Sequence, residues 1–217
     1  MSLVLVTMWS VKGGSGVSVV SAGLAVVLAR RRGSALIVDL QGDQPAVLGL
    51  PEPSGPGVQD WLATPDGSPD ALDRLSVDVS SSLRLLPAGS ATDWSDARVD
   101  ALVAALGREE RPVVVDAGVA ARGPLGPRLA RAGVSLLVTR PCYLALRRAV
   151  RSSVQADGVV LVADAGRALD RRDVEQVLGL PVLCVVEVDP VVARAVDAGV
   201  LVSRLPKAFE RSLRAVS

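Results

Sequence analysis

Residues 9–18 read WSVKGGSGVS and form a glycine-rich loop between two patterned segments. An apolar, strand-like run at residues 3–7 precedes the loop, and a helix-like run at residues 17–32 follows it. Glycines let the backbone approach phosphate oxygens closely, and a helix N-terminus directs N–H groups and partial positive charge at them. The stretch therefore predicts a phosphate-binding loop on an α/β fold.

The loop departs from the common phosphate-binding motif at one charged position. That motif, G-x-x-x-x-G-K-[ST], places its lysine on the β/γ-phosphates and its hydroxyl on magnesium. Here Ser18 supplies the hydroxyl, Val17 stands at the lysine position, and Lys12 precedes the glycines. Only two of the 24 basic residues are lysines, which indicates a specific role for Lys12. The alternative is a glycine-rich turn without a ligand.

Composition limits the class of protein. The 217 residues are 49% hydrophobic and only 2% aromatic, which predicts one domain spanning residues 1–217 with a Val, Leu and Ala core. A net charge of +1 argues against nucleic-acid binding as the main activity. The chain has no histidine, and Cys142 and Cys184 lie far apart, so we expect no zinc, iron–sulfur or haem site. Without a signal peptide or a membrane-spanning run, a cytoplasmic location is expected.

Apolar runs alternate with helical patterns along the chain. This alternation predicts a doubly wound α/β fold, a mostly parallel sheet of about seven strands with helices on both faces. The expected strands are residues 3–7, 35–39, 83–87, 113–116, 134–139, 159–163 and 182–186, and the expected helices 18–32, 97–107, 144–154, 171–178 and 191–198. Residues 51–69 and 119–127 are rich in Pro and Gly and are predicted as surface loops.

The glycine loop resembles the deviant Walker A motif, KGGxGK[ST], of the ParA/MinD family of dimeric ATPases. Further segments resemble family motifs in the same order along the chain: residues 36–50 its switch I strand and continuation, 83–89 its L-P-A-G strand, 113–118 its Walker B and switch II segment, and 186–199 its I-P-x-D segment. The resemblance covers the whole chain and implies a P-loop fold of the SIMIBI type.

The resemblance also implies the roles of individual residues. Lys12 would cross to the nucleotide of a second subunit in a homodimer that forms through the P-loop face. Asp39 and Asp43 are the other catalytic candidates in switch I. The magnesium candidates are Ser18, Asp39 and Asp116. The nucleotide-binding candidates are Gly13, Gly14, Ser15, Gly16, Val17 and Ser18.

Three departures from the family pattern affect function more than fold. Val17 removes a phosphate contact that contributes ~1.5–3 kcal/mol, so ATP binding with Mg²⁺ is expected to weaken roughly 10- to 100-fold. Gln41 stands where switch I usually has its second aspartate, with Asp43 as a nearby replacement. Asp164 and Glu187 stand where the family has residues near the adenine. Hydrolysis should suffer more than binding, because phosphoryl transfer depends on positioning and charge.

This pattern favours a pseudo-ATPase over an enzyme. The predicted function is a non-hydrolysing or very slow, nucleotide-responsive dimeric scaffold that positions a cellular assembly. Degenerate relatives such as the TadZ/CpaE proteins mark sites of pilus assembly. The first alternative is an active ATPase in chromosome, plasmid or cargo partitioning, and the second is an interaction protein without nucleotide. A protein partner is expected, of an identity that the sequence does not specify.

Two surface segments suggest further partners that the sequence does not favour. Residues 206–217 could form a short helix with Phe209, Leu213 and Val216 on one face. Docking on the protein's own surface is preferred to membrane contact, because three apolar anchors are few for an interfacial helix. The arginines near residue 140 are interpreted as a solvated helix face and not as a DNA site; they are Arg140, Arg147, Arg148 and Arg151.

Overall fold

The computed structural model describes residues 5–119 and 125–217, and these residues contain one eight-stranded sheet. The strands are β1 (Leu5–Ser10), β2 (Ala35–Asp39), β3 (Val77–Asp78), β4 (Leu83–Leu86), β5 (Val113–Val119), β6 (Val134–Thr139), β7 (Gly158–Ala163) and β8 (Val182–Glu187). Their order is β3-β4-β2-β5-β1-β6-β7-β8. All pairs are parallel except β3 with β4. The predicted doubly wound, mostly parallel α/β fold is confirmed.

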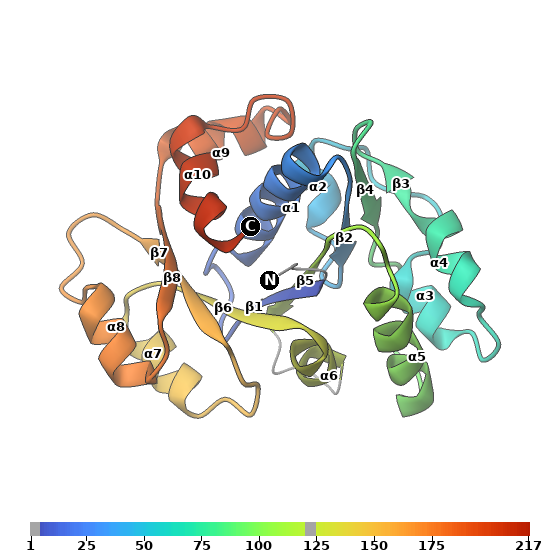
Figure 1. Cartoon of the computed structure of the whole chain (residues 1–217), viewed down its shortest axis with the longest axis horizontal. Coiled ribbons are helices and arrows are strands. Elements are labelled where there is room, and N and C mark those ends of the chain that lie inside the picture. The colour runs from blue at the N-terminus through green and yellow to red at the C-terminus, as the bar shows by residue number, and fades with distance from the viewer. Residues whose placement is uncertain (1–4, 120–124) are drawn as a thin grey trace.

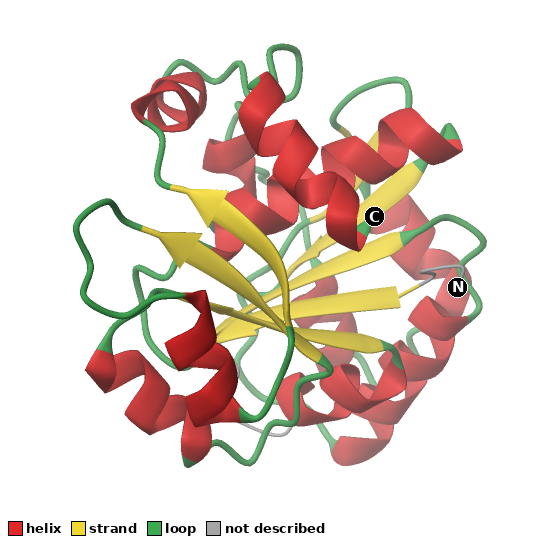
Figure 2. Ribbon diagram, turned by 60° about the vertical axis from the view of Figure 1, so that its left-hand side comes forward, coloured by secondary structure: helices red, strands yellow, loops and turns green. Residues whose placement is uncertain are grey.

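Helices cover both faces of this sheet (Figures 1 and 2). One layer holds α1 (Val17–Arg32), α2 (Gln44–Leu48), α9 (Pro190–Asp197), α10 (Lys207–Leu213) and the 3₁₀ turn η1 (Arg214–Val216). The other holds α3 (Val58–Ala63), α4 (Pro69–Leu75), α5 (Asp96–Gly107), α6 (Leu125–Ala132), α7 (Tyr143–Val150) and α8 (Arg171–Leu178). The central strands are buried on both sides, as their continuous apolar sequences require.

The structure changes several predicted boundaries. The first strand continues to Ser10, so Trp9 is a buried strand residue and not part of the loop. The eighth strand, β3, has only two residues. Residues 51–69 are not all loop, because α3 places Val58, Trp61 and Leu62 in the core. The second predicted loop, residues 119–127, is wrong at both ends, because Val119 ends β5 and residues 125–127 begin α6. Its residues 120–124 lie outside the described residues.

Helix α1 is the centre of its layer. Eleven of its sixteen residues are buried, so the helix is in contact with protein on most sides. Helix α10 packs against it through Phe209 and Leu213, and Val216 of η1 is also buried. The C-terminal segment thus docks on the protein's own surface, as predicted from its short apolar stripe.

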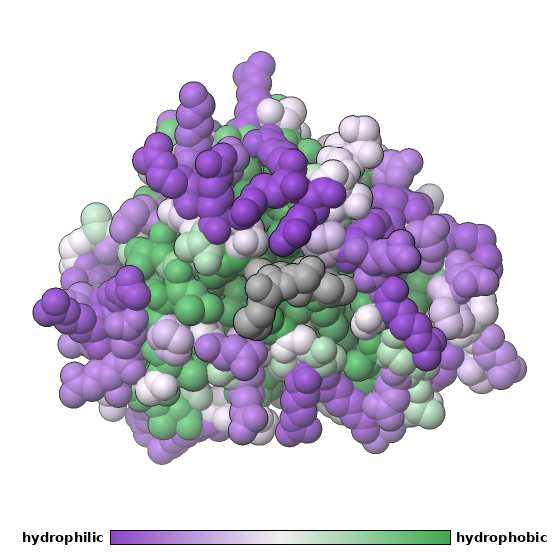
Figure 3. Space-filling model, in the orientation of Figure 1, coloured by the Kyte–Doolittle hydropathy of each residue, from purple (hydrophilic) through white to green (hydrophobic). Residues whose placement is uncertain are grey.

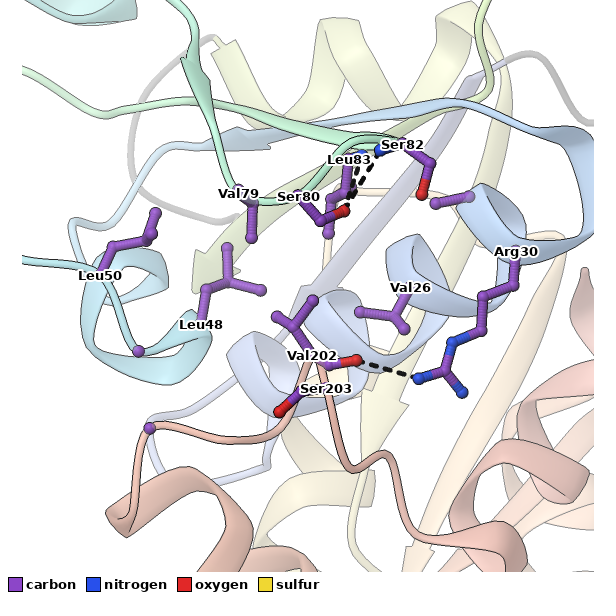
Figure 4. Close-up of a pocket in the computed structure, with 13 residues that line it drawn as sticks. Val26, Arg30, Leu48, Leu50, Val79, Ser80, Ser82, Leu83, Val202 and Ser203 are labelled. Atoms are coloured by element: carbon purple, nitrogen blue, oxygen red, sulfur yellow. Dashed lines mark hydrogen bonds between the residues drawn. The ribbon is translucent and has the colours of Figure 1, made fainter.

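Two backbone turns meet at the end of this layer, far along the chain from each other. Gly49 ends α2 and Gly199 follows α9, both with positive φ. A Cβ on Gly49 would lie 2.2 Å from the carbonyl oxygen of Gly199, so only glycine fits there. Both glycines line a cavity of about 380 Å³ at the C-terminal end of α1, where Arg30 donates to the Val202 carbonyl at 2.9 Å (Figure 4). The contact between Gly49 and Gly199 joins the end of α2 to the turn after α9.

The surface has few large exposed apolar side chains. In Figure 3 the area over α9 and α10 is hydrophilic, and hydrophobic residues show over β8 and α8, where Leu183 and Val177 are exposed. Tyr143, Leu144 and Val188 follow the carboxyl ends of β6 and β8 and are also exposed. None of the described helices has the length and hydropathy needed to span a membrane.

Candidate functional site

The glycine loop joins β1 to α1 at the carboxyl edge of the sheet, beside the point where the strand order reverses. Ligands of doubly wound proteins bind in this crevice. Gly14 and Gly16 have φ of 73° and 92°, which side chains rarely adopt. The hydroxyls of Ser10 and Ser15 both donate to the Lys12 carbonyl, at 2.9 and 3.0 Å, and fix the loop.

The N-terminus of α1 is free to accept an anion. No side chain caps it, and its first turn contains no acidic residue. The first N–H groups of a helix have no partner within the helix, and its dipole favours negative charge. Because α1 has sixteen residues and begins at the glycine loop, its N-terminus is the principal candidate for phosphate binding.

The loop contributes little positive charge of its own. The Val17 side chain is only 6% exposed and belongs to the apolar core. Lys12 is partly buried, and its Nζ donates to the neighbouring Gly13 carbonyl at 3.3 Å. Among the described residues, Lys12 forms no ion pair. Its charge is therefore available to another group.

Two buried carboxylates lie beside the loop. Asp39 ends β2, Asp116 lies in β5, and the two are register partners on adjacent strands. Both are fully buried. Burial raises the pKa of both carboxyls, that of Asp116 to about 6, and each is raised further by a neighbouring carboxylate, Asp39 in the case of Asp116. The resemblance to the family's strand segments had made both residues magnesium candidates, and the structure brings them together.

The backbone after β2 wraps around Asp39. Its Oδ1 accepts from the N–H groups of Gln41 and Gly42 at 2.8 and 2.9 Å. Its Oδ2 accepts from the Gln44 N–H at 2.9 Å. These hydrogen bonds favour the charged form and offset part of the burial effect on its pKa. Asp39 therefore holds the turn of residues 40–44 in place.

Gln41 and Asp43, the two residues predicted at or near the second switch I position, lie in different surroundings. The Gln41 amide donates to the carbonyls of Leu40 and Ala117, at 2.9 and 3.4 Å. Asp43 is exposed, and its Oδ2 lies 3.4 Å from the Ser18 hydroxyl that donates to it. The structure thus brings Asp43, and not Gln41, next to the loop hydroxyl.

Sequence reasoning missed Gln44, the first residue of α2. This side chain is fully buried. Its Nε2 donates to Asp116 Oδ2 at 2.7 Å and to the Ser18 carbonyl at 3.0 Å. Its Oε1 has no hydrogen-bond partner in the described part of the chain. A glutamine directly before Pro45, at the start of a helix that follows an acid-ending strand, was the available signal.

The donor atoms beside the loop include those that a divalent cation would need. Ser18, Asp39 and Asp116 converge and offer the oxygen ligands that magnesium prefers. However, every carboxylate oxygen of the pair already accepts a hydrogen bond, and the Gln44 amide lies against Asp116. No cluster of three acidic or cysteine side chains suited to a metal occurs in residues 5–119 and 125–217. As arranged, these residues do not fit a directly bound cation.

A cavity of about 320 Å³ opens on the other side of the loop, beginning at Gly16. Its walls are mainly apolar and include four charged residues, Arg140, Glu187, Asp189 and Asp197; the apolar members are Val19, Val20, Val162, Val186, Val188, Val192, Ala193, Val196 and Phe209. The Arg140 guanidinium pairs with Asp164 at 3.1 Å. An apolar pocket with a few polar groups suits a flat ring system.

The sheet order, the loop entering an uncapped helix and the acidic pair together define a P-loop α/β protein. Solved structures of MinD and ParA ATPases have the same fold. MinD from Pyrococcus horikoshii, solved with Mg-ADP, is 20% identical, with a TM-score of 0.74 over 98% of this chain and 93% of that chain. A ParA family ATPase from Chlorobium tepidum is 20% identical, with a TM-score of 0.73 over 97% of each chain. MinD in the MinC:MinD complex from Aquifex aeolicus is 18% identical, with a TM-score of 0.78 over 98% and 94%.

At these identities the likeness establishes the fold, and the predicted resemblance to the ParA/MinD family is confirmed at that level. No protein-family model matches the sequence, and no curated protein does.

Proposed function

We propose that this chain is a degenerate ParA/MinD-type protein, a dimeric scaffold that binds nucleotide, hydrolyses it slowly or not at all, and positions a cellular assembly. The observation that carries the proposal is the contrast within the loop. Its backbone has positive φ at Gly14 and Gly16, which supports close approach to a phosphate, whereas Val17 is buried in the core. Backbone N–H groups bind phosphate in both ground and transition states, but little added charge is available to stabilise the transition state.

The cavity beside Gly16 supports nucleotide binding. Its position places an apolar wall next to the predicted phosphate site, as a base and its phosphates require. MinD from Pyrococcus horikoshii was solved with Mg-ADP, which makes an adenine nucleotide the first ligand to test. In this proposal Gly13, Gly14, Ser15, Gly16, Val17 and Ser18 supply the phosphate contacts.

One observation favours the active ATPase as a second candidate. Asp43 lies against the Ser18 hydroxyl, close to where switch I would need an acidic residue. In that case Lys12 and Asp43 would compensate for Val17 and Gln41. Removal of the Asp43 carboxylate would then abolish turnover.

Two measurements separate these functions. Calorimetric titration with ATP and ADP reports binding, and phosphate release at saturating ATP reports turnover. We expect binding with little or no release in the wild type. Robust release that is lost in Asp43→Asn supports the active ATPase. No binding at millimolar nucleotide supports an interaction protein without nucleotide.

We also propose a homodimer through the P-loop face. Lys12 has no acidic partner in the described part of its own chain, and Tyr143, Leu144 and Val188 are exposed at the same carboxyl edge. Two-fold dimers are the commonest assemblies of soluble proteins. Light scattering with and without ATP should show a dimer that Lys12→Ala weakens. A monomer under all conditions, in both proteins, contradicts the proposal.

The partner of the scaffold is proposed to be another protein. MinD from Aquifex aeolicus was solved in complex with MinC, so proteins of this fold bind protein partners. Pilus or secretion machinery is the kind of assembly predicted from the sequence. Affinity purification of this chain with ATP, compared with the Gly14→Ala variant, would identify nucleotide-dependent partners.

A further inference from the structure

Gln44 joins three parts of the site through its backbone N–H and its side-chain amide. Its backbone N–H donates to Asp39 at 2.9 Å, and its Nε2 donates to Asp116 at 2.7 Å and to the Ser18 carbonyl at 3.0 Å. These partners belong to the end of β2, to β5 and to the first turn of α1. One residue of α2 therefore ties the switch I turn to the acidic strand and to the phosphate-binding helix.

The NH₂ group of Gln44 interacts with the same oxygen atoms that a bound cation would contact. Its two hydrogens carry partial positive charge, and both point at oxygen atoms that attract a cation. At 2.7 Å from Asp116 Oδ2, the nitrogen leaves no room for an ion between itself and that oxygen. A divalent ion liganded by Asp116 and by the first turn of α1 must therefore displace the amide.

The unpaired end of the same amide shows what holds Gln44 in place. Oε1 is buried without a hydrogen-bond partner among the described residues, which is unfavourable for a polar atom. The side chain keeps this orientation because the reverse one would turn an oxygen toward Asp116 and toward the Ser18 carbonyl. The contact of the NH₂ group with the carboxylate thus outweighs the loss at the oxygen.

We infer that Gln44 is a positioning residue whose amide takes the place of the divalent cation and keeps the site closed to metal in the absence of nucleotide. The inference deepens the proposed function, because a site that carries its own substitute for the cation is suited to binding and not to phosphoryl transfer. It rests on contacts within the protein alone. Metal titrations without nucleotide therefore test it independently of whether nucleotide binds.

The test uses Mn²⁺ as the probe, with binding followed by electron paramagnetic resonance of the free ion. Wild type, Gln44→Ala and Gln44→Asn are compared, and Gln59→Ala serves as the matched control. Gln59 also donates its amide to a backbone carbonyl, that of Leu40 at 3.3 Å, but does not contact the acidic pair. Circular dichroism and thermal unfolding establish which variants fold.

We expect no Mn²⁺ uptake by wild type or by Gln59→Ala at millimolar concentrations, and no rise in Tm with Mn²⁺. Gln44→Ala and Gln44→Asn, which withdraw the amide from Asp116, should bind Mn²⁺ at least about tenfold more tightly and gain Tm on its addition. Binding by wild type with the affinity of the variants overturns the inference. So does a folded Gln44 variant that gains no affinity. If neither variant folds, the wild-type titration alone decides.

Discussion

The two ends of the candidate site differ in burial and in whether their polar groups are already hydrogen-bonded within the protein. At one end, Asp39 and Asp116 are fully buried and their oxygens are engaged by backbone N–H groups and by Gln44. At the other end, a cavity of about 320 Å³ opens beside Gly16 with mostly apolar walls. Both ends adjoin the same glycine loop. The acidic end is closed by the protein's own groups, while the apolar end is open to a ligand.

In the proposed function this difference would separate recognition from chemistry. Hydrolysis needs charges that are free to act on the transition state, whereas the oxygens of Asp39 and Asp116 already accept hydrogen bonds from the protein. Binding would use the glycine loop and the apolar cavity beside it. The comparison predicts that variants at the acidic end change stability and metal binding, and that variants at the open end change nucleotide affinity.

The largest expected effect is loss of stability at the acidic end. Asp39→Ala leaves three N–H groups of the switch I turn without their acceptor, so the free energy of unfolding should fall by about 3 kcal/mol. At the open end, Asp189 caps α9 by accepting from the Val191 N–H, and Asp189→Ala should cost only about 1 kcal/mol. Urea unfolding measures both. Equal losses would remove the distinction between the two ends.

The second largest expected effect concerns position 17, where the common phosphate-binding motif has a lysine and this chain has a valine. Val17→Lys restores a cation at the lysine position, and we expect ATP affinity to rise roughly 10- to 100-fold. Because the Val17 side chain is buried, the same change should lower Tm. Val17→Met is the matched control, since it has a similar length without charge. If Val17→Met raises affinity as much as Val17→Lys, charge is not what the loop lacks.

A smaller effect is expected from filling the open end. Ala193 lines the cavity and is exposed on α9, so Ala193→Phe should occupy the space without disturbing the core. Nucleotide affinity should fall about tenfold, within the range for one ring contact, with Tm unchanged. A fluorescent nucleotide titration measures it. Unchanged affinity would mean that the base binds elsewhere.

The smallest expected effect is a difference in reactivity between the thiols of Cys142 and Cys184, measured on the folded protein. Cys184 lies in β8 behind the cavity wall, is buried, and donates to the Ser212 carbonyl at 3.1 Å. Burial raises the pKa of its thiol to about 11, so at pH 8 almost none of it is the reactive thiolate. A disulfide reagent at pH 8 should therefore modify Cys142 but not Cys184. Rapid labelling of both, with Cys142→Ser as control, would show that α10 opens readily.

Periodicity predicted the strands and long helices that position the site. Asp39 and Asp116 were predicted from the resemblance of their strands to family motifs, and the structure places them as register partners on β2 and β5. The sequence did not predict Gln44, because a single glutamine acquires its partners only from the tertiary arrangement of β5 and α1. The helices α2 to α4 were missed for a related reason. Each has at most seven residues, and Pro and Gly surround them, so packing decides their conformation.

The contact between Gly49 and Gly199 gives the two ends of the site a common mechanical link. Helix α2 begins with Gln44 at the acidic end and finishes at Gly49, and α9, which walls the open cavity, finishes next to Gly199. The two main chains touch with no side chain between them, so there is no flexible group to absorb a displacement. Movement of α2 on release of Gln44 would push directly on α9. Binding of a ligand at one end of the site would then shift the backbone at the other end. The shift would pass through the Gly49–Gly199 contact, which has no room for a Cβ atom on Gly49.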